Sequence, residues 1–106
     1  MGRAVNIYMY DKLAGLLVES ENGYAFSYDE HYKGKPISLS MPISNNSFAS
    51  EQLHPFFKSL APEGWLKKRF SEIQQIDERD LLGFLIENGK DLLGAITITK
   101  VVNKDE

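Results

Sequence analysis

The chain has no cysteine, only four prolines, a single tryptophan and no long apolar run. Without cysteine it can form neither disulfides nor thiolate metal sites, which fits a reducing compartment. Its longest apolar segment, residues 13–18, is far too short to cross a bilayer as a helix. We find no secretory signal pattern either, and we therefore expect a cytoplasmic protein.

An excess of basic residues is also missing. Twelve Lys and Arg residues stand against fifteen Asp and Glu residues, which leaves a net charge of −3. Nucleic-acid-binding domains usually carry a basic surface, so direct DNA binding is disfavoured. With 106 residues, 42% of them hydrophobic and 25% charged, the chain has the composition of one folded domain over residues 1–106.

The motifs of phosphoryl transfer and of metal binding are absent from the sequence. There is no Gly-x-Gly-x-x-Gly loop, no His-Arg-Asp and no Asp-Phe-Gly. The triplet Asp29-Glu30-His31 is typical of a solvated loop, since neighbouring residues rarely converge on one substrate atom. His54 has no second histidine at a ligand spacing. We therefore predict no catalytic residues, no cofactor and no metal, and hence not an enzyme.

Strands dominate the first half of the chain. Residues 5–9 alternate apolar and polar side chains with a period of two, residues 13–20 follow the first turn as a largely apolar segment, and residues 24–28 place Tyr24, Phe26 and Tyr28 on one face. Asp11-Lys12 predicts the first turn, and Asn22-Gly23 predicts a type I′ hairpin, because both residues tolerate positive φ. These segments predict a three-stranded antiparallel meander.

A fourth strand is predicted over residues 36–42, where Ile37, Leu39 and Met41 alternate with serines between two prolines. Proline at both ends favours an edge strand. Residues 45–52 then form a polar connector, with no strand expected there.

The apolar period changes at Pro55, which is suited to the first position of a short helix over residues 55–60. A second helix is predicted from Pro62 to Gln75. Its core face consists of Leu66, Phe70 and Ile73, which recur at i, i+4 and i+7.

Asp77 predicts the N-cap of a third helix, with Glu78 and Asp80 favourably placed in its first turn. Gly89 marks its end, and residues 96–99 alternate again as a last strand. Strands, then helices, then one returning strand predict an α+β fold. We expect an antiparallel sheet of about five strands with two to three helices packed on one face.

Trp65 lies outside the predicted core face of the second helix. A rotation of about 100° per residue places it on the side of Lys68, Arg69 and Glu72. Exposed tryptophan beside arginine is typical of binding hot spots, because a large rigid ring is desolvated at small entropic cost. Gly64 costs about 1 kcal/mol relative to alanine in a helix, which suggests close approach of a partner to the backbone. We predict that these five residues bind a partner; the alternative is that Trp65 covers the edge of the core.

Four segments, in this order, resemble the N-terminal subdomain of the HipA-type serine/threonine kinase toxins. Each is weak alone, but their order and spacing cover nearly the whole chain. They are Tyr24–Asp29, Ile37–Pro42, Phe56–Gly64 and Asp91–Ile96.

A separate form of this subdomain, HipS, occurs in three-part toxin–antitoxin systems whose HipT kinase lacks it, and this chain resembles that form. The resemblance implies an antitoxin that binds and neutralises a HipT/HipA-type kinase in trans, with a HipB-like helix-turn-helix protein completing a ternary complex. It implies a cytoplasmic bacterial protein without catalytic residues. Two alternatives stay open: a non-inhibitory subdomain that completes or stabilises the kinase, and an N-terminal fragment of a full-length HipA-like kinase.

Overall fold

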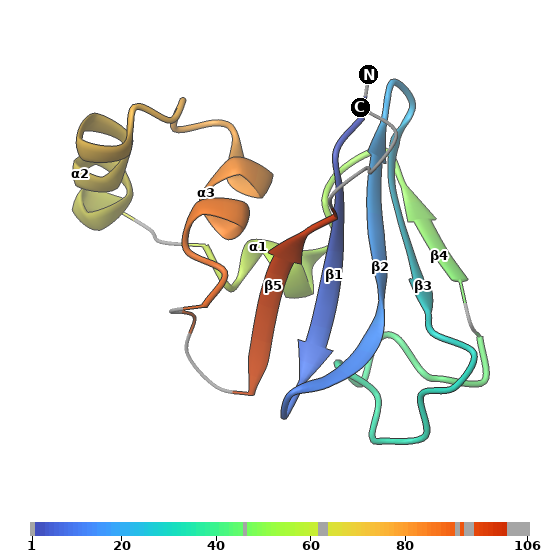
Figure 1. Ribbon diagram of the computed structural model, residues 1–106. Coiled ribbons are helices and arrows are strands. Elements are labelled where there is room, and N and C mark those ends of the chain that lie inside the picture. The colour runs from blue at the N-terminus through green and yellow to red at the C-terminus, as the bar shows by residue number, and fades with distance from the viewer. Residues whose placement is uncertain (1, 46, 62–63, 91, 93–94, 102–106) are drawn as a thin grey trace.

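The computed structural model describes residues 2–45, 47–61, 64–90, 92 and 95–101, apart from the side chains of residues 64 and 65. These residues form one antiparallel sheet of five strands, in the order β4-β3-β2-β1-β5, and three helices (Figure 1). The predicted α+β class is therefore confirmed.

Three strands form the predicted meander: β1 (Ala4–Met9), β2 (Lys12–Ser20) and β3 (Gly23–Tyr28). Strand β5 (Ile96–Lys100) pairs with β1 and returns the chain to the sheet. In this register, side chains from neighbouring strands meet on the buried face of the sheet. One row of that face runs through Val5, Leu17 and Phe26.

Both hairpin turns lie one residue earlier than predicted. In the first, Met9 pairs with Lys12, so the turn consists of Tyr10 and Asp11, which both have positive φ. In the second, Ser20 pairs with Gly23, so that glycine opens β3 instead of completing the turn. Its φ of 132° and the nearby Ser50 carbonyl exclude a side chain there.

The predicted strand over residues 36–42 is wrong. Ile37 and Met41 are buried, but Leu39 between them is 97% exposed, and the Met41 N–H donates to the Ser38 carbonyl in a turn. The Tyr28 hydroxyl accepts from the Ile37 N–H and donates to the Met41 carbonyl. This buried phenol satisfies backbone groups that a sheet would otherwise pair.

The fourth strand is instead β4 (Ser47–Ser50), which pairs with β3 at the edge of the sheet. It lies in the segment that we expected to be a polar connector. Phe48 is its only large side chain and lies opposite Phe26, so the polar neighbours hid a strand of four residues.

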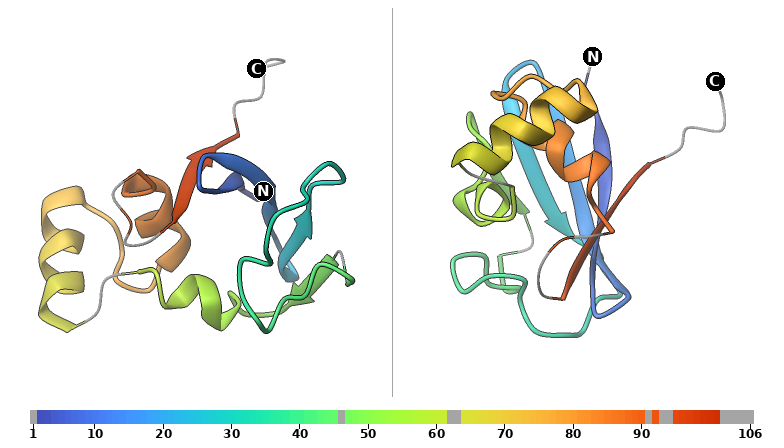
Figure 2. Two further views of the ribbon diagram at one scale, coloured as in Figure 1. Left: turned by 90° about the horizontal axis from the view of Figure 1, so that it is seen from below. Right: turned by 90° about the vertical axis from the view of Figure 1, so that its left-hand side faces the viewer.

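The helices are α1 (Pro55–Lys58), α2 (Gly64–Gln74) and α3 (Leu81–Glu87). The proline at the first position of α1 is confirmed, and His54 caps this helix by accepting from the Phe56 N–H at Nδ1. The predicted helix start at Pro62 lies outside the described residues. Helices α1 and α3 lie against the same face of the sheet, and α2 lies beyond α3 (Figure 2).

Helix α3 begins later than predicted. Its N-cap is Asp80, whose carboxylate accepts from the Gly83 N–H at 3.0 Å. Asp77 instead closes a turn upstream by accepting from the Arg79 N–H at 2.8 Å. Asp80 is favoured as the N-cap because its carboxylate also accepts hydrogen bonds from Arg3, the residue directly before β1.

The hydrophobic core lies between the inner face of the sheet, α1, α3 and the loop after β3. Its buried residues are Val5, Ile7, Ala14, Leu17, Phe26, Tyr28, Ile37, Met41, Leu53, Phe57, Ala61, Leu82, Leu85, Ile96 and Ile98. None of them comes from α2.

Candidate partner-binding surface

Helix α2 turns one side toward the rest of the domain. Lys67, Phe70, Ser71 and Gln74 are half-buried and recur at i, i+3, i+4 and i+7, the spacing of one helical face. This side faces α3, which lies between α2 and the sheet (Figures 1 and 2).

Asn88, the C-cap of α3, binds α2 through a pair of hydrogen bonds. The Gln74 and Asn88 side chains exchange amide hydrogen bonds of 2.9 and 3.1 Å. Phe84 lies one turn before Asn88 on the same face of α3. It is fully buried yet does not belong to the main core cluster. We infer that α2 covers Phe84, so this phenyl ring forms a small second core between the two helices.

The outer side of α2 carries three of the predicted binding residues. Lys68, Arg69 and Glu72 are all exposed. Gly64 and Trp65 are the first two residues of the same helix. Trp65 precedes Lys68, Arg69 and Glu72 by three, four and seven positions. The Trp65 side chain lies outside the described residues. The predicted set therefore shares one helical face by position.

The predicted core face of α2 is wrong. Ile73 is 65% exposed and Leu66 is 38% exposed, while only Phe70 is half-buried. The helix is rotated so that Phe70 and Gln74, rather than Leu66 and Ile73, point toward α3. The amide pair with Asn88 and the cover over Phe84 explain this rotation. An apolar flank is thus left beside the charged outer side.

A charged network fixes the start of α3 to the sheet. The Arg3 guanidinium donates to Glu19 at 2.7 Å and to Asp80 at 2.8 Å. These hydrogen bonds hold the pKa of both carboxyl groups below their ordinary values and raise the pKa of Arg3. The network thereby fixes the helix against which α2 packs.

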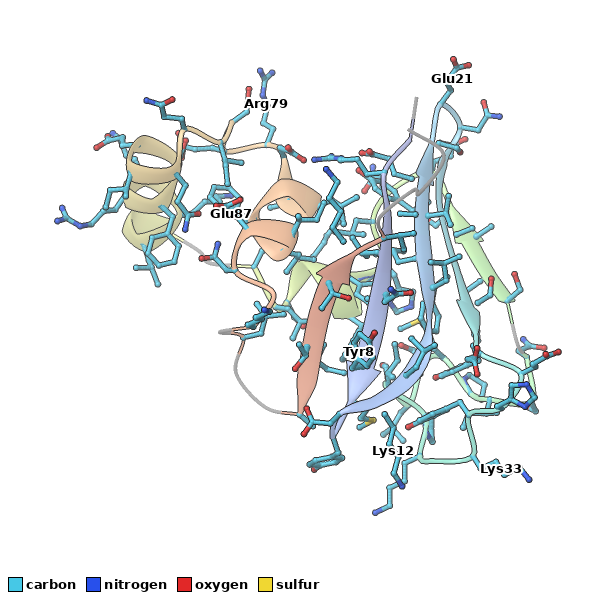
Figure 3. All side chains as sticks on the ribbon, viewed as in Figure 1. Tyr8, Lys12, Glu21, Lys33, Arg79 and Glu87 are labelled. Carbon is cyan, nitrogen blue, oxygen red and sulfur yellow. The ribbon has the colours of Figure 1, made fainter. Side chains whose placement is uncertain are left out.

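Two further charged pairs lie in solvated positions. The Glu30 and His31 side chains are each 85% exposed, as expected for a loop. Arg79 pairs with Asp77 in the link between α2 and α3 and projects away from the domain (Figure 3). Among the described residues, we find no group of three His, Asp or Glu side chains able to hold a metal ion. No helix in this part of the chain is long and apolar enough to cross a membrane.

The family model described as the HipA N-terminal domain matches residues 5–99, which takes in all described strands and helices except Ala4 at the start of β1 and Lys100 at the end of β5. The chain belongs to this family. The match is to the N-terminal domain of HipA and does not extend to a kinase domain.

Two relatives support the assignment to the HipA N-terminal domain. An uncharacterized protein of Haemophilus influenzae is 46% identical over 96 residues, which is 91% of each chain. A solved structure titled "N-terminal domain of HipA toxin" is 41% identical with a TM-score of 0.80, and the match covers 96% of this chain and 95% of that one.

Sequence reasoning missed two features of α2 in this HipA N-terminal domain. Leu66 and Ile73 were assigned to the core, because periodicity shows that a helix is amphipathic but not what covers it. The hydrogen-bonded pair of Asn88 with Gln74 was not predicted. The position of Asn88 one turn after the apolar Phe84 was the available signal that a second helix packs there.

Proposed function

We propose that this chain is an antitoxin-type regulatory protein that binds a HipT/HipA-type serine/threonine kinase in trans and neutralises it. Membership of the HipA N-terminal domain family supports a partner of this class. The observation that carries the proposal is the placement of α2, which lies outside the core and exposes Lys68, Arg69 and Glu72.

The proposed mechanism is steric. Helix α2 docks beside the nucleotide cleft of the kinase, Trp65 inserts toward that cleft, and Lys68 and Arg69 pair with carboxylates around it. Gly64 allows the partner to approach the backbone at the start of the helix. In this proposal the chain supplies no catalytic group and acts in the cytoplasm.

Co-expression with the HipT-type kinase of the host tests this proposal. We expect the wild-type chain to restore growth of cells that express the kinase, and Trp65→Ala to lose this protection while remaining folded. Leu39→Ala is the matched control, because Leu39 is exposed and belongs to the loop between β3 and β4, a segment that lies away from α2 (Figure 1). Equal protection by Trp65→Ala and wild type would remove Trp65 from the mechanism.

One observation favours a second candidate. The solved relative is titled as a domain of the toxin itself, which is compatible with a subdomain that completes the kinase. In that case, co-expression would increase the toxicity or the soluble yield of the kinase. A kinase assay with the purified partners separates the two functions, since an antitoxin lowers the phosphorylation rate and a stabilising subdomain raises it.

A further inference from the structure

We propose that the exposed apolar flank of α2, formed by Leu66 and Ile73, packs into an apolar groove with an acidic rim on the partner kinase. This inference rests on the proposed function, because it names the kinase surface that would receive the same helix. It adds two residues that face neither the core nor the charged side.

The two side chains lie on one line along the helix. Leu66 and Ile73 are separated by seven residues, or about two turns, and Arg69 lies between them at i+3 from Leu66. Apolar residues at such spacings are typical of helices that lie in a groove of a partner protein. Ile73 is 65% exposed although the chain buries its other isoleucines fully or in part.

The charge of α2 identifies the rim of the groove. The helix carries Lys67, Lys68 and Arg69 against Glu72, a net charge of +2; Lys67 lies on the half-buried side, so Lys68 and Arg69 are the cations that the outer side offers to a partner. The whole chain has a net charge of −3, so the remaining residues together carry −5. Because α2 is basic and the rest of the chain is acidic, an acidic surface attracts α2 and repels the rest of the chain. The chain therefore approaches such a surface with α2 foremost.

The position of α2 gives a partner access to this flank. The helix lies on the far side of α3 from the sheet and stands at the end of the molecule (Figures 1 and 2). A groove can therefore enclose both the apolar flank and the charged outer side without displacing another element of the described chain.

Affinity for the purified HipT-type kinase of the host tests the groove. We expect Ile73→Asp and Leu66→Asp each to weaken binding about tenfold or more, as for apolar residues at the centre of an interface. Leu39→Asp is the matched control, since it places the same charge on an exposed leucine in the loop between β3 and β4, which lies away from α2 (Figure 1). Thermal unfolding checks that each variant stays folded.

A double charge reversal tests the acidic rim. We expect Lys68→Glu combined with Arg69→Glu to weaken binding and to reduce its dependence on salt, because the screened attraction is lost. Unchanged affinity and salt dependence would overturn the acidic rim.

The outcomes separate this inference from the proposed function. If Ile73→Asp and Leu66→Asp bind like wild type while Trp65→Ala binds weakly, the groove is wrong and the function stands. If the wild-type chain does not bind the kinase, both fail. If Ile73→Asp instead turns a dimer into a monomer in sedimentation and leaves kinase affinity unchanged, the flank binds a second copy and the proposal is overturned.

Discussion

The side-chain amides of Gln74 in α2 and of Asn88, the C-cap of α3, donate hydrogen bonds to each other. Gln74 Nε2 donates to Asn88 Oδ1 at 2.9 Å, and Asn88 Nδ2 donates to Gln74 Oε1 at 3.1 Å. We infer that this pair, together with the cover that α2 provides over buried Phe84, sets the rotation of α2 and so decides which of its residues face solvent.

Removing the amide pair should loosen α2. We expect Gln74→Ala and Asn88→Ala each to lower the free energy of unfolding, with a coupling energy of about 0.5–1.5 kcal/mol in a double-mutant cycle. Chemical denaturation of the two single variants and the double variant measures the coupling. Strictly additive effects would show that the amide pair contributes no interaction of its own.

Phe84 should matter more than the amide pair. We expect Phe84→Ala to lower the free energy of unfolding by about 3 kcal/mol, because it removes a fully buried ring and leaves a cavity between two helices. Amide hydrogen exchange in α2 should also become faster. Phe48→Ala on the distant edge strand is the control, since it should reduce stability without selectively loosening α2. Unchanged exchange in α2 of Phe84→Ala would contradict the proposed second core.

The hydrogen bonds of Arg3 with Glu19 and Asp80 should make the free energy of unfolding depend on pH. The pKa values of Glu19 and Asp80 are lowered in the folded protein from the ordinary 4.5 and 3.8, chiefly by hydrogen bonds from Arg3. A lowered folded pKa gives stability that is fully present above the ordinary value and is lost as pH falls through the folded value.

We therefore expect Arg3→Met to cost about 1–2 kcal/mol near neutral pH, a modest value because the three side chains are a fifth to a third exposed. The difference from wild type should shrink steadily as pH falls below about 4, where the carboxylates bind protons. Urea unfolding at a series of pH values measures it. A difference that stays constant down to pH of about 2 would exclude the linkage to these carboxyl groups.

Tyr28 should hold the loop that replaces the predicted fourth strand. We expect Tyr28→Phe to cost about 1–3 kcal/mol, because it leaves the buried Ile37 N–H and Met41 carbonyl without their partner. Tyr32→Phe is the matched control: its hydroxyl bonds the Lys35 carbonyl in an exposed position, so its loss should cost less. Equal losses in the free energy of unfolding for the two variants would show that burial of the Tyr28 hydroxyl does not increase the cost of removing its hydrogen bonds.

Most features that depend on contacts between sequence neighbours were predicted correctly, whereas several that depend on contacts between distant residues were not. Alternation of apolar residues indicated β1, an aromatic face indicated β3, and the turn signals between them placed β2, because hairpin strands pair with their sequence neighbours. The same alternation failed over residues 36–42, where Tyr28 binds the backbone of a turn. The edge strand β4 escaped notice because it has a single large apolar residue, Phe48.

The candidate site also divides into features that helical spacing predicts and features that only the tertiary structure shows. The shared helical face of Lys68, Arg69 and Glu72 follows from their spacing on a regular helix, and their exposure agrees with it. Their role in binding a kinase stays a prediction. The exposure of Leu66 and Ile73 could not be predicted, because an apolar stripe indicates burial without naming the element that provides it.

The sequence by itself determined the α+β class, the meander, the three helices and the absence of kinase motifs, since these depend on local periodicity and on residue identity. Only the tertiary structure decided where α3 begins, which residues form β4 and which side of α2 faces outward. Those features depend on contacts between distant residues, such as Arg3 with Asp80 and Gln74 with Asn88, whose formation no local pattern encodes.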